Sequence, residues 1–272
     1  MARVIVLPLG GAVVDKGAIM LPEAGPGVRV WAPVHAFVVE TGGERYLVDT
    51  GMHVDHVRDP DLTFGGEEFA KVLTPQMGPG DTLPAALARA GLRPGDITAV
   101  INTHLHFDHA GNNFLFSGIP IFVQAEMREH ADGNPAFPAR YWDLPGLDYR
   151  LLDGDGELAP GLEVVVTTGH VPGHQSVVVS LGRSGGGSAG AAGSGGAAGS
   201  GEPSSVVICG DAVFSRENLE LGSWSTQGDA ELARTSAARL EAIAADRNGI
   251  LIFGHDPEQV GQLRYAPEAY GC

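Results

Sequence analysis

The chain has 272 residues, a formal net charge of −16 at neutral pH and 43% hydrophobic residues. That hydrophobic content can build the core of one large α/β domain or two small ones, which excludes a globally disordered chain. The acidic balance excludes nucleic acid as a partner, because basic surfaces bind phosphate backbones, and it disfavours polyanionic substrates unless metal ions reverse the charge locally.

The sequence carries no sign of export or membrane insertion. It has no apolar run of about 20 residues, so we expect no transmembrane helix and no membrane partner. Pro8 interrupts the apolar first segment and no small-residue cleavage pattern follows, which favours a first strand over a signal peptide. Two cysteines, Cys209 and Cys272, cannot form a disulfide framework. We therefore expect a cytoplasmic protein.

Apolar patterning predicts strands and helices in mixed order along the chain. The residues between 56 and 81 resemble a long loop, whose apolar side chains could line a substrate pocket, form a homodimer interface or fold back on the core. The expected helices span residues 82–90, 125–130 and 231–245. The expected strands span 3–9, 34–40, 45–49, 97–101, 119–124, 149–152, 162–167, 177–181, 206–209 and 249–253.

Residues 182–205 form a low-complexity segment of glycine, alanine and serine between two of these apolar strands. Such side chains bury little surface, and the entropic cost of closing a loop grows slowly with its length. We interpret the segment as an expanded hairpin loop within a single domain spanning 1–272. Shortening it should leave metal binding intact.

The stretch His104-Leu105-His106-Phe107-Asp108-His109 is the strongest functional signal, and it directly follows a predicted strand. Imidazole and carboxylate groups suit zinc and similar divalent metals. His104 and His106 project to the same side of an extended backbone, because side chains two apart share a face. Four ligand candidates this dense suit two metal ions better than one. The alternative is a histidine-rich polar loop without metal.

Three other strand ends also carry ligand candidates beside glycine. They are Gly169-His170, with His174 four residues after the histidine, Gly210-Asp211, and Gly254-His255. Glycine lets the backbone turn sharply and approach a metal closely. We therefore expect these segments to converge above one sheet edge. Asp49, at another strand end, could cap its turn or hydrogen-bond a metal-bound histidine.

These motifs resemble the metallo-β-lactamase fold superfamily, whose signature H-x-H-x-D-H stands at residues 104–109. Within it, the chain is most similar to the N-acyl-homoserine lactonases. The similarity is in the residue patterns of segments 104–111, 169–176, 253–256 and 73–77. The resemblance covers nearly the whole chain apart from the Gly/Ala/Ser segment. It implies an α/β (α+β) fold, a four-layer αββα sandwich of two similar halves with a dinuclear site at its edge.

The resemblance also implies the ligands of two divalent ions. Zinc is the expected ion, and iron, manganese or cobalt are alternatives. The first ion would be held by His104, His106 and His170, the second by Asp108, His109 and His255, with Asp211 bridging both. His174 would lie behind the ligands or contact substrate, unless it is a buried histidine satisfied by backbone groups.

A water shared by two such ions would have its pKa lowered from about 16 towards about 7. The resulting metal-bridging hydroxide could attack a carbonyl carbon while one ion stabilises the oxyanion. Asp108 would relay the proton to the leaving alkoxide. We therefore predict a hydrolase that opens the ester ring of a lactone, with N-acyl homoserine lactone as the first candidate.

Phe214 departs from the lactonase pattern. Lactonases of this group commonly carry tyrosine three residues after the bridging aspartate, and its hydroxyl assists at the substrate carbonyl. Phenylalanine keeps the ring but lacks the donor. The substitution points to weaker activity on acyl-homoserine lactones, or to another ester or lactone.

Other members of the fold are rival interpretations. A thioester hydrolase of the glyoxalase II type shares the site but usually adds a C-terminal helical region, and only 17 residues follow His255. A β-lactamase conflicts with the cytoplasmic expectation, and an RNA nuclease with the acidic charge. A mononuclear iron sulfur dioxygenase has the same fold, and its metal content would distinguish it from a dinuclear hydrolase. A metal-free scaffold or sensor would not need the full set of ligands.

Overall fold

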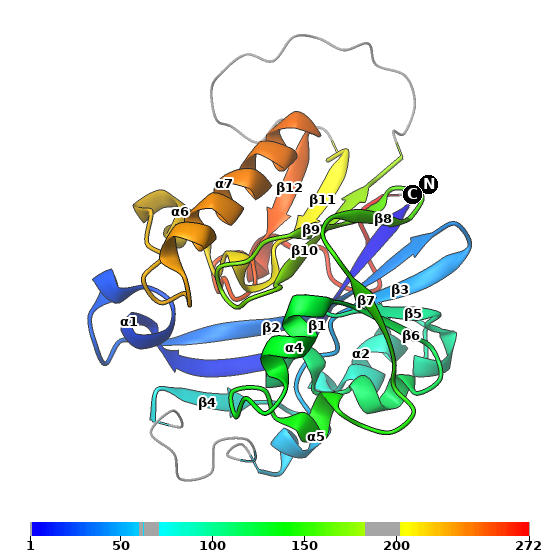
Figure 1. Ribbon diagram of the computed structural model, residues 1–272, viewed down its shortest axis with the longest axis horizontal. Coiled ribbons are helices and arrows are strands. Elements are labelled where there is room, and N and C mark those ends of the chain that lie inside the picture. Colours follow the sequence, from blue (N-terminus) through cyan, green and yellow to red (C-terminus); the bar gives the residue numbers. More distant parts are fainter. Residues whose placement is uncertain (1, 60–61, 63–70, 183–201, 272) are drawn as a thin grey trace.

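The computed structural model describes residues 2–59, 62, 71–182 and 202–271, which form two β-sheets packed face to face with helices on the outside (Figure 1). The first sheet has the order β4-β1-β2-β3-β5-β6-β7 and the second β12-β11-β10-β9-β8. No helix in this part of the chain is both long and apolar enough to cross a bilayer.

The strands of the first sheet are β1 (Arg3–Asp15), β2 (Arg29–Thr41), β3 (Glu44–Val48), β4 (Leu73–Gln76), β5 (Ala99–Ile101), β6 (Pro120–Gln124) and β7 (Asp148–Leu152). Those of the second are β8 (Gly156–Ala159), β9 (Leu162–Val166), β10 (Gln175–Ser180), β11 (Ser205–Ile208) and β12 (Gly249–Ile252). The helices are α1 (Lys16–Ile19), α2 (Leu83–Arg89), α3 (Phe107–Ala110), α4 (Ala125–Ala131), α5 (Ala139–Trp142), α6 (Arg216–Leu221) and α7 (Ala230–Asp246).

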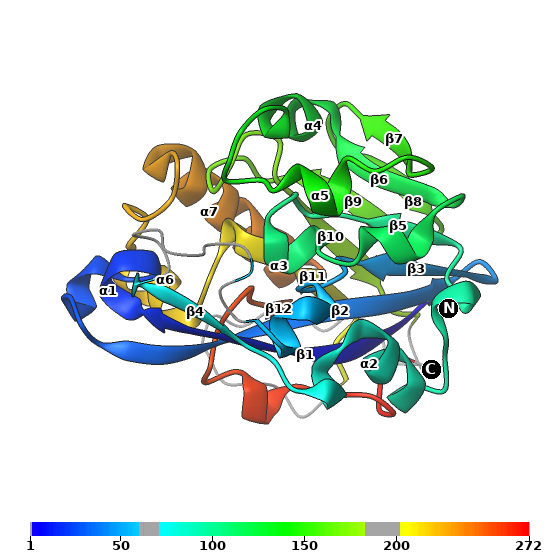
Figure 2. The same cartoon turned by 90° about the horizontal axis from the view of Figure 1, so that it is seen from below.

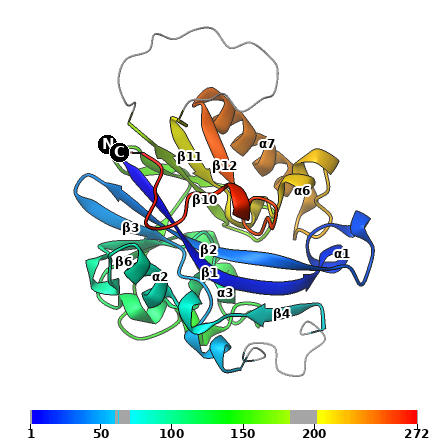
Figure 3. The ribbon, with the colours of Figure 1, turned by 180° about the vertical axis from the view of Figure 1, so that it is seen from behind.

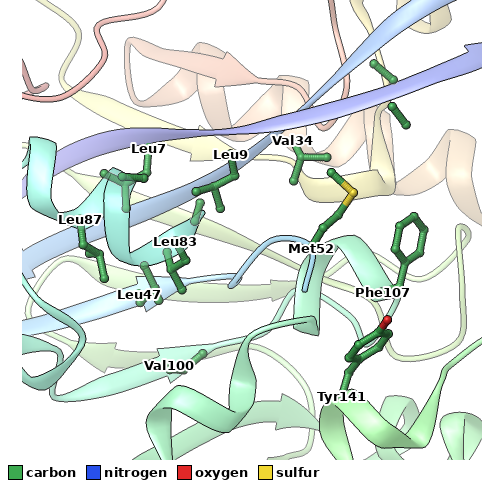
Figure 4. Packing of buried hydrophobic residues seen from close by; sticks show 14 of the residues in the cluster. Leu7, Leu9, Val34, Leu47, Met52, Leu83, Leu87, Val100, Phe107 and Tyr141 are labelled. Carbon is green, nitrogen blue, oxygen red and sulfur yellow. The ribbon is translucent and has the colours of Figure 1, made fainter. Parts of the chain in front are cut away.

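The alternation of side chains along the strands builds the layers. On β1, Val4 and Val6 point towards the second sheet, whereas Ile5 and Leu7 point to the outer face. That outer face packs beneath α2 (Figure 4), and the outer face of the second sheet packs beneath α7 (Figure 3). The order helix, sheet, sheet, helix confirms the predicted αββα sandwich, with halves of seven and five strands.

The N-terminal hairpin is longer than predicted. We expected strands at 3–9 and 34–40, but β1 and β2 each have 13 residues and extend together to α1 (Figure 2). In the structure the register shifts between Pro8 and Gly11, so a bulge absorbs the irregularity and pairing continues to Asp15.

The predicted loop at 56–81 is partly wrong. It contains the strand β4, which pairs antiparallel with β1 from Gly11 to Val14 and forms the edge of the first sheet. His56 is buried, with its ring 5.7 Å from that of Phe107. The homodimer expected through this excursion depends in part on residues 60–61 and 63–70, which lie outside the described residues.

The predicted hairpin that flanks the Gly/Ala/Ser segment is confirmed, since β10 and β11 pair antiparallel with Ser180 opposite Ser205. The Leu181 N–H donates to the Ser204 carbonyl at 2.9 Å, so the two ends of the segment are already together. Most of the segment itself, residues 183–201, lies outside the described residues.

Replacing residues 184–200 with a short Gly-Ser turn should therefore preserve the fold. The shorter loop costs less entropy to close, so we expect unfolding to become less favourable by about 1 kcal/mol, with metal content unchanged. Chemical denaturation and elemental analysis of the two proteins test this. A shortened protein that no longer binds metal would contradict the single-domain interpretation.

Candidate metal centre

Four loops at the ends of strands bring the predicted ligands together. The loop after β5 carries His104 and His106 and continues into α3, which carries Asp108 and His109. The other three loops follow β9, β11 and β12 and supply His170, Asp211 and His255. A fifth loop, which directly follows β3, contributes Asp49. The strands are paired rigidly, so these loop residues are held in fixed relative positions.

The first cluster contains His104, His106, His170 and Asp211, whose ligand atoms all lie within 4.8 Å of one another. His104 Nε2 and His170 Nε2 lie 2.9 and 3.1 Å from His106 Nδ1. Asp211 Oδ2 lies 3.3 Å from His170 Nε2 and 3.7 Å from His104 Nε2. A tetrahedral zinc ion with bonds of about 2.0–2.1 Å would hold its ligand atoms about 3.3 Å apart, which matches this spacing.

The second cluster contains Asp108, His109 and His255. Both histidine Nε2 atoms face Asp211 Oδ1, at 3.2 Å from His109 and 3.1 Å from His255. Asp108 Oδ2 lies 3.8 Å from His109 Nε2 and 3.7 Å from His255 Nε2. Asp211 therefore presents one carboxylate oxygen to each cluster, which is the arrangement a bridging ligand requires.

Hydrogen bonds made by the opposite ring nitrogen determine which nitrogen of a histidine faces the clusters. Four rings use Nδ1 to donate to an acceptor behind them, which turns Nε2 towards the clusters. The pairs are His104 with Thr103 Oγ1 at 3.0 Å, His109 with Asp49 Oδ2 at 2.8 Å, His170 with Gln227 Oε1 at 2.8 Å, and His255 with the Pro33 carbonyl at 2.9 Å.

His106 is turned the other way and presents Nδ1 to the cluster. Its ring lies flat on Phe137, with centroids 4.5 Å apart and planes 7° from parallel. Phe137 is 2% exposed, so the stack leaves the imidazole little freedom to rotate.

Asp49 supports both clusters from behind. It accepts hydrogen bonds from the Thr103 N–H at 2.8 Å, the Thr103 hydroxyl at 2.8 Å and His109 Nδ1. Its φ of 56° is in the left-handed region, an unusual conformation for a residue other than glycine. Of the two roles considered for Asp49, the contact to a ligand histidine is the one that the geometry shows.

His174 lies behind Asp211 and does not line the pocket. Its Nε2 accepts the Asp211 backbone N–H at 3.1 Å, and its Nδ1 donates to the Thr167 hydroxyl at 2.8 Å. The ring is completely buried and does not line the pocket, which favours a place behind the ligand candidates over a contact with substrate. A Cβ at Gly210, where φ is +55°, would lie 2.9 Å from Nε2 of His174, which explains the glycine there.

The site's electrostatics divide the histidines into two groups. Burial, followed by the neighbouring histidines, lowers the pKa of His104 and His106 well below their usual range. Burial opposes protonation of His255 too, but the carboxylates of Asp211 and Asp108 outweigh it and raise the pKa of His255 to about 9. The same balance, with Asp211 first, raises the pKa of His109 well above its usual range.

Buried polar atoms without partners show that these residues fit metal ions. Among the described residues, His109 Nε2 and Asp211 Oδ1 are buried and make no hydrogen bond. Burial alone would raise the pKa of Asp211, but His255 and His109 hold that pKa well below its usual range. Once the Nε2 protons of His109 and His255 are lost, a carboxylate facing inward nitrogen lone pairs at these spacings matches the donor set of divalent zinc.

Metal binding should therefore release protons near neutral pH. Without metal, the raised pKa values keep His109 and His255 protonated, and a metal must displace those protons. The apparent metal affinity of the second cluster should rise with pH and level off above about 9. Metal titration of the metal-free protein in weak buffer with a pH indicator measures this, and an affinity independent of pH would contradict it.

A pocket of about 380 Å³ opens onto both clusters. One end presents His106, Asp108, His170, Asp211 and His255. The remaining wall is mostly apolar and comes from β1, α1, β2, β4, α3 and the loops before α5 and after β11. Its residues are Ala12, Val14, Ile19, Met20, Ala32, Val34, Leu73, Phe107, Pro135, Ala136 and Phe214. A site that is polar at one end and apolar along its length suits an amphipathic small molecule.

The residues that support the ligand candidates from behind were not predicted from the sequence. Thr103 directly precedes the histidine motif and could have been considered from that position. Gln227, Phe137 and the Pro33 carbonyl belong to distant segments and carry no local signal. Their roles depend on which loops the fold brings behind each ligand.

Comparison with known proteins agrees with this geometry. Residues 29–190 match the family model described as the metallo-beta-lactamase superfamily. An N-acyl homoserine lactonase of Bacillus cereus is 32% identical over 262 residues, with 96% of each chain covered. The N-acyl homoserine lactonase AttM of Rhizobium radiobacter is 27% identical, with 90% of each chain covered.

Solved structures give the same result. A lactone hydrolase with the product N-hexanoyl-L-homoserine at its catalytic metal centre superimposes with a TM-score of 0.84, at 32% identity and 98% coverage of both chains. A mutant of Bacillus thuringiensis AiiA with N-decanoyl-L-homoserine bound has a TM-score of 0.84 at 31% identity, again covering 98% of both chains. The chain therefore belongs to the metallo-β-lactamase superfamily and groups within it with the N-acyl homoserine lactonases.

Proposed function

We propose that this protein is a dinuclear metal-dependent hydrolase that opens the ester ring of N-acyl homoserine lactones. The observation that carries the proposal is the pocket that joins the two ligand clusters to an apolar wall. A lactone head would lie at the polar end, and the acyl chain would lie along the apolar wall. The similarity to lactonases over nearly the full length of both chains supports the same assignment.

In this proposal, His104, His106 and His170 hold one ion, Asp108, His109 and His255 hold the other, and Asp211 bridges them. Two divalent ions, zinc first, would supply Lewis acidity for the ester carbonyl and make water a stronger acid. Asp211 and Asp108 would provide the negative charge that two cations require. Asp49 and His174 would keep the ligands in register, through His109 and through the Asp211 backbone.

Asp108 is placed to move the proton of the reaction. Its side chain is 14% exposed, and it lines the pocket beside the ligand clusters. Its carboxylate would accept the proton of the attacking water and return it to the ring oxygen as the ester bond breaks. The reaction then gives a single product, the ring-opened hydroxy acid. Asp108 ends in the protonation state in which it began.

The apolar wall would bind the acyl chain and exclude water from the reacting carbonyl. Met20 and Val34 are almost fully buried in it, and Phe107 lies next to Asp108 in sequence and in the pocket. Removing each methylene from water is worth about 0.8 kcal/mol. Longer chains should therefore bind more tightly until the pocket is filled.

The test combines metal analysis with hydrolysis assays on one sample. The metals per chain are determined by elemental analysis, and proton release is followed with short- and long-chain acyl-homoserine lactones, simple lactones and S-lactoylglutathione. Near two metals with lactone turnover supports the proposal, whereas thioester turnover alone would move the chain to the glyoxalase-like branch. One iron without hydrolysis would refute the lactonase assignment.

The pocket favours the lactone over the thioester. Glutathione carries carboxylates that a binding site pairs with cationic side chains. No lysine or arginine is present among the described residues that line the pocket.

For the proposed homodimer through residues 56–81, sedimentation is the test, and a monomer at micromolar concentration would refute it.

A further inference from the structure

A second, narrow cavity lies between the two sheets, next to the His109/His255 cluster. Its volume of about 10 Å³ accommodates the centre of a single water-sized sphere. It shares only His255 with the substrate pocket. Both sheets contribute to its wall, which consists of His35, Phe37, Asp49, His109, Ile208, Gly210, Ile252, Phe253, Gly254 and His255.

His35 brings an unpaired polar atom to this cavity. It lies on the face of β2 that Phe37 and Val39 turn towards the second sheet, and it is 8% exposed. Its Nε2 lies 2.9 Å from the hydroxyl oxygen of Tyr265, and the two rings stack at 5.7 Å. Its Nδ1 is buried and has no hydrogen-bond partner among the described residues.

Burial, followed by the charge of His255, lowers the pKa of His35 to about 3, so the ring is neutral. A neutral imidazole has one N–H and one lone pair. With Nε2 donating to Tyr265, the lone pair is on Nδ1 and needs a donor. Leaving such a buried group unpaired costs about 1–3 kcal/mol.

Asp49 supplies a matching acceptor in the same cavity. A carboxylate offers about four lone-pair sites, and three of them are used by the Thr103 N–H, the Thr103 hydroxyl and His109. One site on Asp49 is therefore open. Two acceptors, Nδ1 of His35 and this carboxylate, line a space in which the described residues place no donor between them.

We propose that this cavity binds one ordered water molecule, which donates one hydrogen to His35 Nδ1 and the other to the Asp49 carboxylate. Tyr265, His35, the water and Asp49 then form a continuous chain that ends at Nδ1 of His109. His35 is accordingly a positioning residue for the second cluster, acting on the ring of His109 through Asp49. The inference depends on the metal centre and not on which ester the enzyme opens.

The neighbouring backbone shows why β2 can have this role. The Pro33 carbonyl, two residues before His35, already accepts the Nδ1–H of His255 at 2.9 Å. One short stretch of β2 thus reaches both histidines of the second cluster, His255 directly and His109 through the water. Because groups behind the ligands orient them, removing such a group typically lowers metal affinity 10- to 100-fold.

The first experiment is a crystal structure of the metal-loaded protein at a resolution that shows single waters. We expect one water within about 2.7–3.2 Å of both His35 Nδ1 and the Asp49 carboxylate. A cavity without density, or one filled by a repacked side chain, would overturn the proposal. This experiment uses the unaltered protein, so its result does not depend on how well a variant folds.

The second experiment measures the affinity of the more weakly held metal by competition with a chelator. His35→Phe removes the polar atom and fills the space, and we expect about a tenfold loss of affinity. His35→Asn retains a polar atom near the position of Nδ1 and should restore most of it. Val39→Ala removes apolar packing from the same face of β2 outside the cavity wall and should leave the affinity unchanged. Wild-type affinity in His35→Phe, or an equal loss in Val39→Ala, would refute the role of the water.

Discussion

Replacing Asp211 with asparagine should remove metal from both clusters and lower kcat/KM for the lactone by at least about a hundredfold, roughly 2.7 kcal/mol. Asp211 Oδ1 and Oδ2 face different clusters, so the single substitution affects both. The amide lacks the negative charge, and its NH₂ group would present hydrogens where one cluster needs a lone pair. Elemental analysis and lactone hydrolysis measure the two effects on the same sample.

The same variant should also change the titration of the metal-free protein. Without the carboxylate, burial dominates and the raised pKa of His255 should fall from about 9 towards or below its usual range. Histidine NMR resonances would report this directly. Asp148→Asn is the matched control, because it removes the same charge from an exposed pair with Arg150. Equal losses in both variants would show a general charge effect and contradict the bridging role.

Replacing Phe214 with tyrosine should raise the rate of opening of acyl-homoserine lactones by about 10- to 100-fold. The Phe214 ring lines the pocket between the clusters, with centroids 5.4 Å from His170 and 5.8 Å from His255. A phenol added there could donate a hydrogen bond to the carbonyl oxygen as its negative charge develops. That interaction is strongest in the transition state, so the gain should appear in kcat more than in KM.

Phe214→Leu is the control that distinguishes the effect of the added hydroxyl donor from the effect of a changed side chain at this position. Leucine keeps an apolar wall but loses the edge contact with His170, so it should not accelerate the reaction. If the tyrosine variant is slower on acyl-homoserine lactones than the unaltered protein, Phe214 is adapted to a different ester. The substrate panel would then show which ester it is.

The ligand set could be predicted from the sequence because its signals are local. His104, His106, Asp108 and His109 lie within six positions, and the other three ligands each follow an apolar strand beside glycine. A strand delivers the chain to the sheet edge and the glycine lets the backbone turn there, so the polar side chain that follows can be placed at that edge. The family resemblance then supplied the pairing of these segments and the fold.

Other local signals were misleading. The first strand was predicted to end at residue 9, but pairing with β2 on one side and β4 on the other carries β1 on to Asp15. Similarly, the excursion before α2 has no strong periodicity, and the strand β4 exists because β1 offers it an edge. Tertiary pairing overrides weak local preference in both cases.

The sequence by itself predicted a metal centre, the two-sheet class and the residues that form the two clusters of ligand candidates. Only the tertiary structure decided what stands behind those residues. His174 faces the Asp211 backbone rather than the substrate, and His35 meets Tyr265 from 230 positions away. Ligand type follows from side-chain chemistry, which each residue carries with it. Contacts behind the ligands follow from packing between distant segments, and no short stretch of sequence encodes them.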